Sequence, residues 1–275
     1  MTKATSSKPE RVRRARRIAS ASRDRRHGST AREGHVDVSA VGGCVSATLE
    51  RPGMGNRLSA AMARRLIELA EEVEDDDSAL MLAIRGAGGA FCAGFDDDVD
   101  SAVVESLAVL SKPTLAIIGG AADDEGMELA LAMDLRVAAP AARFTMGQLA
   151  SGRLPRFGGT QRLPRLIGAA QALRLMLTGE AVEGREAMRL GLVTYLAPGG
   201  PALERVAGEI IRTLTSRGPV AARLAKEAVR KGYDLTLDQG IRLEEDLYAL
   251  LQTTADRAEG VRAFLEKRKP LFRGA

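Results

Sequence analysis

The residues best suited to chemistry are the acidic side chains at the start of one apolar helix, Asp123, Asp124, Glu125 and Glu128. Negative charge at a helix start suits the positive end of the helix dipole. The N–H groups of the first helical turn have no acceptor within the helix, so they can bind an anion that develops during a reaction. Glu128 follows Glu125 by three residues and projects from the same face, one turn on. A carboxylate beside unpaired N–H groups suits chemistry next to a carbonyl.

The surrounding sequence predicts the elements that position these side chains. Thr114–Ile118 has the apolar pattern of a buried strand, and the chain then turns through Gly119 and Gly120. Met127–Met133 predicts an apolar helix, and Leu135–Ala138 predicts a second short strand. The acidic residues are therefore expected at a turn between a strand and a helix.

Structural roles would also explain these acidic residues. Asp123–Glu125 suits a solvated helix start, where charged side chains face water. Glu128 lies among the apolar residues of its helix, where a carboxylate is costly unless it is paired or useful. A buried ion pair between Glu128 and Arg136 is therefore the alternative to a catalytic role.

Strand and helix patterns alternate along the core and then become almost wholly helical. Before the acidic cluster we expect a hairpin of strands 35–41 and 44–49 around Gly42–Gly43, a helix from an N-cap at Ser59 to Glu74, a strand at 79–84 and a helix at 101–110. After it we expect a short strand around Tyr195 and helices at about 160–177, 183–190, 202–215, 219–231, 238–252 and 254–267. The pattern predicts an α/β fold in which helices connect parallel strands. The expected parts are a tail of 1–34, an α/β core of 35–200 and a helical region of 201–275.

The charge is distributed unevenly along the chain. Residues 1–33 hold 11 Lys and Arg against 3 Asp and Glu, or +8, whereas the whole chain carries +4, which leaves 4 − 8 = −4 for the remainder. The tail is rich in Arg and Ser and lacks apolar periodicity, so we predict that it is disordered. It could be a transit peptide, a nucleic-acid-binding arm or an unselected extension with a start codon placed too far upstream. Nucleic-acid binding is the less favoured use.

Composition excludes several other classes of protein. No apolar run approaches the roughly 18 residues of a membrane span, and hydrophobic content of 45% suits a soluble globular protein. Cys44 and Cys92 form no disulfide framework or metal spacing, so we expect a reducing, cytoplasmic location, or a mitochondrial one if the tail is a transit peptide. His27 and His35 lie at or near the tail, which leaves the core without a histidine for a Ser–His triad or a His-based metal site. No metal is expected.

Five stretches, in order and spacing, resemble the crotonase (enoyl-CoA hydratase/isomerase) superfamily. They are KPTLAIIGGAADDEGMELALAMDLRVAA (112–139), GAGGAFCAGFD (86–96), FGGTQRLPRLIG (157–168), LTGEAVEGREAMRLGLV (177–193) and EGVRAFLEKRKPLF (259–272). The resemblance implies a crotonase-like spiral of ββα units, with a helical C-terminal region that forms a homotrimer or a dimer of trimers. It also implies a CoA thioester as substrate and no further cofactor.

The resemblance further implies an oxyanion hole, in which two backbone N–H groups stabilise a thioester enolate. By motif position Ala93 supplies the first N–H, Gly94 lets the acyl-CoA approach closely, and Glu125 supplies the second N–H. The family has a Gly-Gly-Gly run where this chain has Asp124-Glu125-Gly126. A carboxylate facing the enolate would oppose its charge, so the Glu125 side chain must point away, be protonated or have changed the chemistry.

Two acid/base positions follow from the same resemblance. Glu128 matches the glutamate that orients and deprotonates the attacking water in a hydratase. Gln148 stands where a hydratase has its second glutamate, and an amide is a very poor proton donor. Near the reacting carbons, Phe157 is expected to narrow the pocket and Arg156 to hold a substrate carboxylate, although Arg156 would equally suit the surface.

Other residues match the segments that bind CoA in the family, and Arg57 suits a phosphate. The residues expected at the acyl-CoA are Asn56, Arg57, Leu58, Gly94, Phe95 and Asp96. Enoyl-CoA hydratase or isomerase chemistry is the leading hypothesis. The alternatives are another enolate reaction, such as decarboxylation or C–C cleavage, and a catalytically impaired homologue that acts as a partner subunit or nucleic-acid binder.

Overall fold

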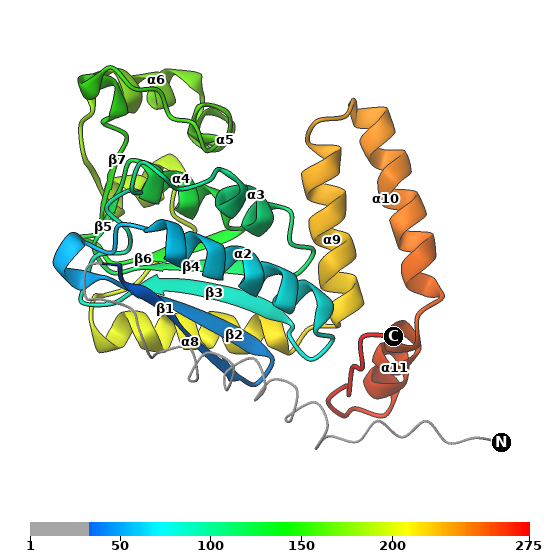
Figure 1. Cartoon of the computed structure of the whole chain (residues 1–275). Helices are drawn as coiled ribbons and strands as arrows, with labels where there is room; N and C mark the ends of the chain where they lie inside the picture. Colours follow the sequence, from blue (N-terminus) through cyan, green and yellow to red (C-terminus); the bar gives the residue numbers. More distant parts are fainter. Residues whose placement is uncertain (1–32) are drawn as a thin grey trace. The chain divides into compact units, whose positions relative to one another are not determined.

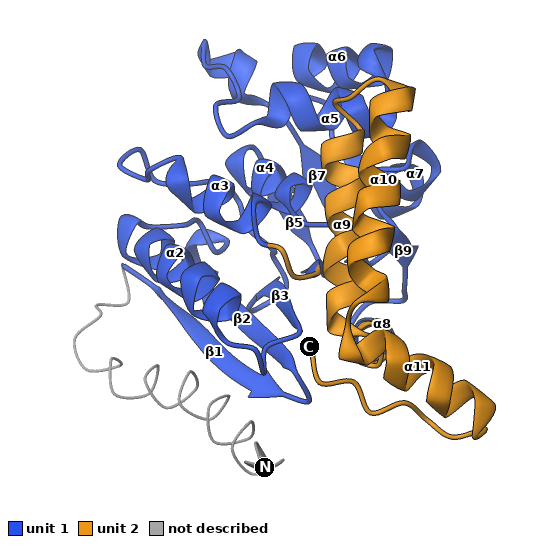
Figure 2. Cartoon of the chain, turned by 90° about the vertical axis from the view of Figure 1, so that its right-hand side faces the viewer, with its two compact units in different colours: residues 1–110, 114–209 blue, residues 111–113, 210–275 orange. Residues whose placement is uncertain are grey.

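The structure of the protein is a computed structural model that describes residues 33–275 (Figure 1). These residues form two compact units (Figure 2). Unit 1 comprises the described residues up to Leu110 together with Thr114–Glu209, and unit 2 comprises Ser111–Pro113 and Ile210–Ala275. The boundary falls inside helix α8 (Pro201–Thr215), whereas the sequence placed it just before that helix. The tail predicted to be disordered, 1–34, lies outside the described residues except for its last two.

Unit 1 begins with the predicted hairpin. Strands β1 (His35–Val41) and β2 (Cys44–Glu50) pair antiparallel. Gly42 and Gly43, which join them, have φ of +59° and +86°, a region that residues with side chains rarely adopt. A short 3₁₀ turn, η1 (Pro52–Met54), follows β2.

Helix α2 (Ala60–Asp75) also forms where the sequence predicts it. The hydroxyl of Ser59 accepts a hydrogen bond from the N–H of Met62 at 3.3 Å and so caps the first turn. The buried face of the helix is the apolar stripe expected from its periodicity, and its members are Met62, Ala63, Leu66, Leu69, Ala70 and Val73.

A six-stranded sheet in the order β1-β2-β3-β4-β6-β9 forms the base of unit 1. The strands added to the hairpin are β3 (Met81–Gly86), β4 (Thr114–Ile118), β6 (Leu135–Ala138) and β9 (Tyr195–Leu196). They all pair in parallel, as predicted. Every residue of β4 is buried, because a central parallel strand is covered on both faces. Helices α2, α3 (Ala102–Ala108) and α4 (Glu125–Ala132) lie side by side on one side of this sheet (Figure 1).

A second, three-stranded sheet has the order β5-β7-β8. Its members are β5 (Ala121–Asp123), β7 (Arg143–Thr145) and β8 (Val182–Glu183). The chain twice passes from the large sheet to this small sheet and then into a helix, as β4–β5–α4 and as β6–β7–α5 (Gly159–Ile167). This repetition confirms the predicted spiral of ββα units. The small sheet itself was not predicted, because strands of two or three residues are too short to show a period of two.

The helix predicted at 160–177 is wrong in one respect, because the structure has two helices there. They are α5 and α6 (Ala169–Thr178), and Gly168 between them has φ of 82° and ψ of 152°, far from helical values. Helix α7 (Gly184–Leu190) follows as predicted, and a 3₁₀ turn, η2 (Gln148–Ser151), precedes α5.

Unit 2 is helical, as the sequence predicts. Its elements are the end of α8, α9 (Pro219–Gly232), α10 (Leu237–Gln252) and α11 (Ala255–Leu265). Helices α9 and α10 pack against each other, yet neither has a buried residue. A capping box between Thr236 and Gln239 begins α10. Among the helices of the described chain, none is both long and apolar enough to cross a membrane.

Candidate active site

The turn into α4 places the predicted acidic residues at the start of a buried helix. Asp124 has φ of 51° and ψ of −116°, the conformation of the first central residue of a type II′ turn, where glycine is usual. Its Oδ1 accepts a hydrogen bond from the N–H of Gly147 at 2.7 Å, which holds the turn. A Cβ on Gly126 would lie 1.9 Å from the carbonyl oxygen of Cys92. The first turn of α4 is therefore pressed against the segment that begins at Cys92.

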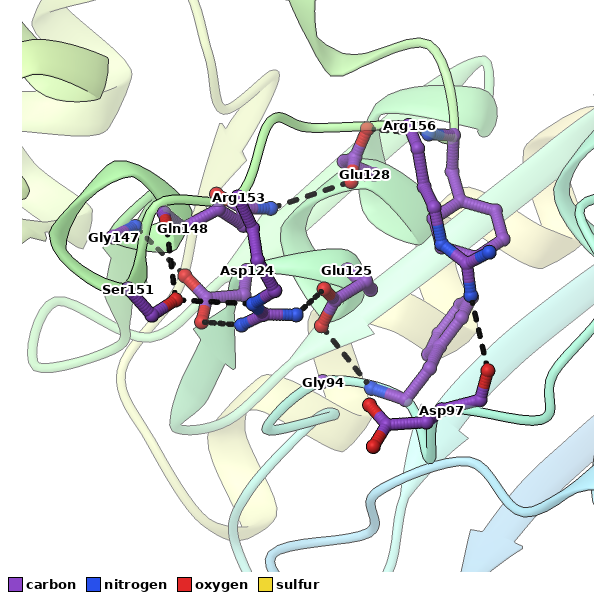
Figure 3. A network of polar contacts seen from close by, with 12 residues as sticks. Gly94, Asp97, Asp124, Glu125, Glu128, Gly147, Gln148, Ser151, Arg153 and Arg156 are labelled. Atoms are coloured by element: carbon purple, nitrogen blue, oxygen red, sulfur yellow. Dashed lines mark hydrogen bonds and ion pairs between the residues drawn. The ribbon is translucent and has the colours of Figure 1, made fainter.

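The Glu125 side chain lies inside this contact rather than in solvent (Figure 3). Its Oε2 accepts a hydrogen bond from the N–H of Phe95 at 3.3 Å, and its Oε1 lies 2.8 Å from Nη1 of Arg153. The interpretation of a solvated helix start is therefore wrong for Glu125. The N–H of Glu125 is the first of α4 and has no acceptor within the helix.

The segment 93–95 corrects the expected first donor of the oxyanion hole. The N–H of Ala93 donates to the carbonyl of Gly55 at 2.9 Å and is therefore engaged within the backbone. The N–H of Phe95 instead points toward the start of α4. Gly94, between them, has φ of +113°, and a Cβ there would lie 2.9 Å from Oε2 of Glu125. Phe95, which the sequence placed at the substrate, is therefore better placed than Ala93 to pair with the N–H of Glu125.

Glu128 is fully buried, with 0% of its surface exposed. Its Oε1 accepts hydrogen bonds from the N–H groups of Phe157 and Gly159, both at 2.8 Å. Burial raises the pKa of Glu128, and these two N–H groups oppose the rise. Arg136, the alternative partner, donates instead to the carbonyls of Met133 and Leu192. N–H groups just before and at the start of α5, and not a Glu–Arg pair, hold this carboxylate.

Gln148 lies beside Glu128, as the two matched motif positions predict. Its Nε2 is 3.3 Å from Oε2 of Glu128, and only 1% of the residue is exposed (Figure 3). The Oε1 atom of Gln148 is buried and has no hydrogen-bond partner among the described residues. A buried amide oxygen without a donor suits a water molecule or a polar substrate atom at this point.

Asn56 supports the loops around the site instead of facing a ligand. Its Nδ2 donates to the carbonyls of Ala87 and Ala90, both at 2.7 Å, and its Oδ1 accepts from the N–H of Arg51 at 3.0 Å. The side chain is completely buried. The predicted contact of Asn56 with CoA therefore needs correction to a structural role.

Arg57, Leu58 and Asp96 bind the segment that carries Phe95. Leu58 donates its N–H to the carbonyl of Gly94 at 3.0 Å and accepts from the N–H of Asp96 at 2.9 Å. The Nε of Arg57 lies 3.5 Å from Oδ1 of Asp96, and its Nη2 donates to the carbonyl of Phe95. These contacts fix the direction of the Phe95 N–H, and contact of these residues with CoA stays a prediction.

Phe157 and Arg156 lie on the segment that leads into α5, and Phe157 packs against Phe95. The rings of Phe95 and Phe157 are 4.9 Å apart and meet edge to face. The guanidinium of Arg156 lies 4.7 Å from the centre of the Phe157 ring, and its Nη2 donates to the carbonyl of Val99 at 3.3 Å. Arg156 thus packs on a site residue, although its contacts are to an aromatic face and a loop carbonyl.

Arg153 also contacts the site, and the sequence did not predict it. Its guanidinium pairs with Glu125, lies 3.8 Å from Oδ2 of Asp124, and receives support from Ser151, whose Oγ is 3.0 Å from Nε. Half of the Arg153 side chain is exposed. The signal available was the unusual carboxylate at Glu125, since a buried carboxylate calls for a nearby cation.

Comparison with known proteins decides the family. The family model described as enoyl-CoA hydratase/isomerase matches residues 40–275. The chain belongs to the enoyl-CoA hydratase/isomerase family. It is therefore an acyl-CoA enzyme of the crotonase superfamily, as the five stretches indicated.

Individual members of the enoyl-CoA hydratase/isomerase family cover most of the chain. Methylglutaconyl-CoA hydratase of Rattus norvegicus is 37% identical over 80% of this chain and 76% of its own length. The 2,3-dehydroadipyl-CoA hydratase of Escherichia coli is 34% identical over 82% of this chain and 94% of its own length. The crystal structure of an enoyl-CoA hydratase from Bacillus anthracis matches with a TM-score of 0.84 and 35% identity, and it covers 87% of this chain and 99% of its own.

Proposed function

We propose that this enzyme hydrates or isomerises an enoyl-CoA through a thioester enolate, with Glu128 as its one acid/base group. The observation that carries the proposal is the arrangement of the Glu128 carboxylate. The N–H groups of Phe157 and Gly159 hold its Oε1, while its Oε2 has a contact of 3.3 Å to the amide of Gln148. A fixed, buried carboxylate with a raised pKa is suited to accept and return a proton near neutral pH.

In hydration, Glu128 takes a proton from water as the water oxygen bonds to C3 of a 2-enoyl thioester. The electron pair of the C2–C3 double bond moves to the thioester oxygen and forms an enolate. The N–H groups of Phe95 and Glu125 donate to this oxygen. Glu128 then delivers its proton to C2, and the carbonyl is restored. Removal of one such N–H donor typically costs about 2.7–4 kcal/mol in the transition state.

Isomerisation would use the same groups without water. Glu128 would remove a proton from C2 of a 3-enoyl thioester and return it to C4, again through the enolate. Gln148 cannot donate a proton at useful rates, so its role in either reaction is to position Glu128 and the attacking water. Its Oε1, which has no partner in the part of the chain that the structure describes, supports this role, because an amide oxygen accepts a hydrogen bond from water.

The names of the relatives favour hydration. Two of them are hydratases of unsaturated acyl-CoA thioesters by their names, methylglutaconyl-CoA hydratase and 2,3-dehydroadipyl-CoA hydratase. The test is the loss of enoyl-thioester absorbance with crotonyl-CoA in the wild type and in Glu128→Gln. We expect turnover in the wild type and a loss of at least about 100-fold in the variant. Glu186→Gln, in the first turn of α7 with 33% of its side chain exposed, is the matched control. Equal turnover by Glu128→Gln would contradict the assigned role.

The catalytically impaired homologue is the second candidate, because the Glu125 carboxylate accepts the N–H of Phe95 that an enolate would need. Binding of acyl-CoA without hydration or isomerisation would favour it. The decarboxylation or C–C cleavage alternative depends on Arg156. It predicts turnover only of acyl-CoAs that carry a carboxylate, lost in Arg156→Ala.

A homotrimer, or a dimer of trimers, is the proposed assembly. Helices α9 and α10 bury none of their own residues in one chain. Large apolar side chains are exposed on or beside these helices, and they are Val229, Tyr233, Leu235, Leu237, Ile241, Tyr248 and Leu250. Exposed apolar surface of this kind marks sites of association. Sedimentation equilibrium should give a mass of three or six chains, and a monomer would contradict the proposal.

The location of the enzyme is proposed to be cytoplasmic. The transit-peptide and nucleic-acid-binding alternatives concern the tail of residues 1–34, almost all of which lies outside the described residues. Salt-sensitive RNA binding that is lost on removal of residues 1–33 would support the second of these alternatives.

A further inference from the structure

The Glu125 side chain carries an inference that deepens the proposed function. Both of its oxygens are engaged, Oε2 by the N–H of Phe95 at 3.3 Å and Oε1 by Arg153 at 2.8 Å. The carboxylate is buried, whereas half of the Arg153 side chain is exposed. The Glu125 carboxylate therefore points inward to the backbone of Phe95, and the guanidinium of Arg153 contacts it from the solvent side.

The contact with Phe95 excludes a substrate oxygen from the same place. An N–H group carries one hydrogen and makes one strong hydrogen bond. While Glu125 accepts it, a thioester oxygen cannot also accept it with good geometry. The absence of a side chain on Gly94 is what admits the carboxylate, since a Cβ there would lie 2.9 Å from Oε2. The charged acceptor also binds the N–H more strongly than the neutral carbonyl of a thioester.

Arg153 decides how firmly the carboxylate stays in this position. Its Nη1 holds Oε1 of Glu125, its Nη2 lies 3.8 Å from Asp124, and its Nε is 3.0 Å from Oγ of Ser151 (Figure 3). The guanidinium is thus fixed on three sides. Without Arg153, the buried carboxylate would keep only the Phe95 contact and would move toward water.

We propose that Glu125 determines which CoA derivatives this site prefers, and that Arg153 is the residue that positions it. In the free enzyme the Glu125 carboxylate occupies the place of the thioester oxygen. An acyl-CoA binds productively only by displacing it toward solvent along with Arg153. This inference rests on the proposed function, because it takes the N–H of Phe95 as a donor to the thioester. As a consequence, the thioester oxygen adds little to the binding free energy of an acyl-CoA in the wild-type enzyme.

The test compares two ligands that differ at that oxygen. Butyryl-CoA is a saturated thioester that cannot be hydrated, and S-butyl-CoA is the thioether with CH₂ in place of the carbonyl. Calorimetry on the full chain should give dissociation constants within about threefold of each other for the wild type. Glu125→Ala keeps the N–H but removes the carboxylate, and it should bind butyryl-CoA about tenfold more tightly, the size of one hydrogen bond to the neutral thioester carbonyl. Its affinity for S-butyl-CoA and both affinities of the control Glu186→Ala should not change.

A double-mutant cycle separates positioning by Arg153 from direct contact with the ligand. Arg153→Ala should strengthen butyryl-CoA binding in the wild-type background and have no effect in the Glu125→Ala background. Arg153→Lys retains the charge and should keep the dissociation constants for the two ligands close to each other, as in the wild type. Equal effects of Arg153→Ala in both backgrounds would show a direct contact and overturn the assignment.

The two proposals fail in different ways. A wild type that already prefers butyryl-CoA by tenfold or more, with the same preference in Glu125→Ala, would overturn the role of Glu125 and leave the proposed function intact. Failure of every variant to bind either ligand would overturn the proposed function, and the inference with it.

Discussion

Replacement of Gln148 by glutamate tests whether the lack of a second carboxylate limits the hydration rate of this enzyme. The amide nitrogen of Gln148 lies 3.3 Å from Oε2 of Glu128, and the two residues are 1% and 0% exposed. The new carboxylate would therefore take nearly the same position without a change in shape. Two buried carboxylates at this distance cannot both ionise, so they share a proton.

The magnitude follows from the distance. At an effective dielectric constant of about 20, two unit charges 3.3 Å apart repel by roughly 5 kcal/mol. Repulsion of this size raises the pKa at which the pair would lose its last proton, so the pair keeps one proton after the other has left. The raised pKa belongs to the pair rather than to either residue. The variant gains the carboxylic acid that the wild type lacks.

Hydration of crotonyl-CoA is the assay. A well-placed general acid contributes about 10²–10⁴-fold, and in a loop not adapted to it we expect a gain of about 10–100-fold in kcat. Gln161→Glu, an exposed position at the start of α5, is the control for added charge and should leave kcat unchanged. The reasoning is refuted if Gln148→Glu folds and binds butyryl-CoA, yet shows no gain at any pH between 5 and 9 (on the order of two units either side of neutral).

Three further predictions concern stability and reactivity. Burial raises the pKa of Glu128, so the folded protein keeps this proton to higher pH than the unfolded chain, and the free energy of unfolding should fall as pH rises from 4.5 through the raised pKa. In Glu128→Gln, the free energy of unfolding measured by chemical denaturation should fall less steeply over this pH range. The same dependence on pH in the variant and the wild type would contradict the prediction. Asp124→Ala should lower the free energy of unfolding by about 2 kcal/mol, since it loses the bond to Gly147 and keeps the positive φ, whereas Asp124→Gly should lose less. Burial raises the pKa of Cys92 to about 12, so its thiol should resist iodoacetamide in the folded enzyme and react only after unfolding, as mass spectrometry of the modified peptide would show.

The elements with a long apolar pattern were predictable from the sequence. β4 and β6 have the predicted bounds, and the cap of α2 at Ser59 forms as expected. The break at Gly168 was missed because helical periodicity continues on both sides of it, and one residue decides the backbone direction. The short strands of the second sheet owe their existence to their neighbours rather than to their own composition.

Some contacts of the site were likewise predictable from the sequence, and others were not. Glu128 and Gln148 meet as their matched positions indicated, because both lie on elements fixed by the core. Ala93 and Phe95 are two residues apart on one loop, and only the three-dimensional path shows which N–H faces α4. The pairing of Glu125 with Arg153 spans 28 residues and has no period or spacing that a sequence could reveal.

The most direct test of the enolate site is a crystal structure of the enzyme with butyryl-CoA bound. We expect the thioester oxygen within about 3.2 Å of the N–H nitrogens of both Phe95 and Glu125, with the Glu125 carboxylate displaced toward solvent. A thioester oxygen bound elsewhere, with the Glu125 carboxylate still on the N–H of Phe95, would contradict the site.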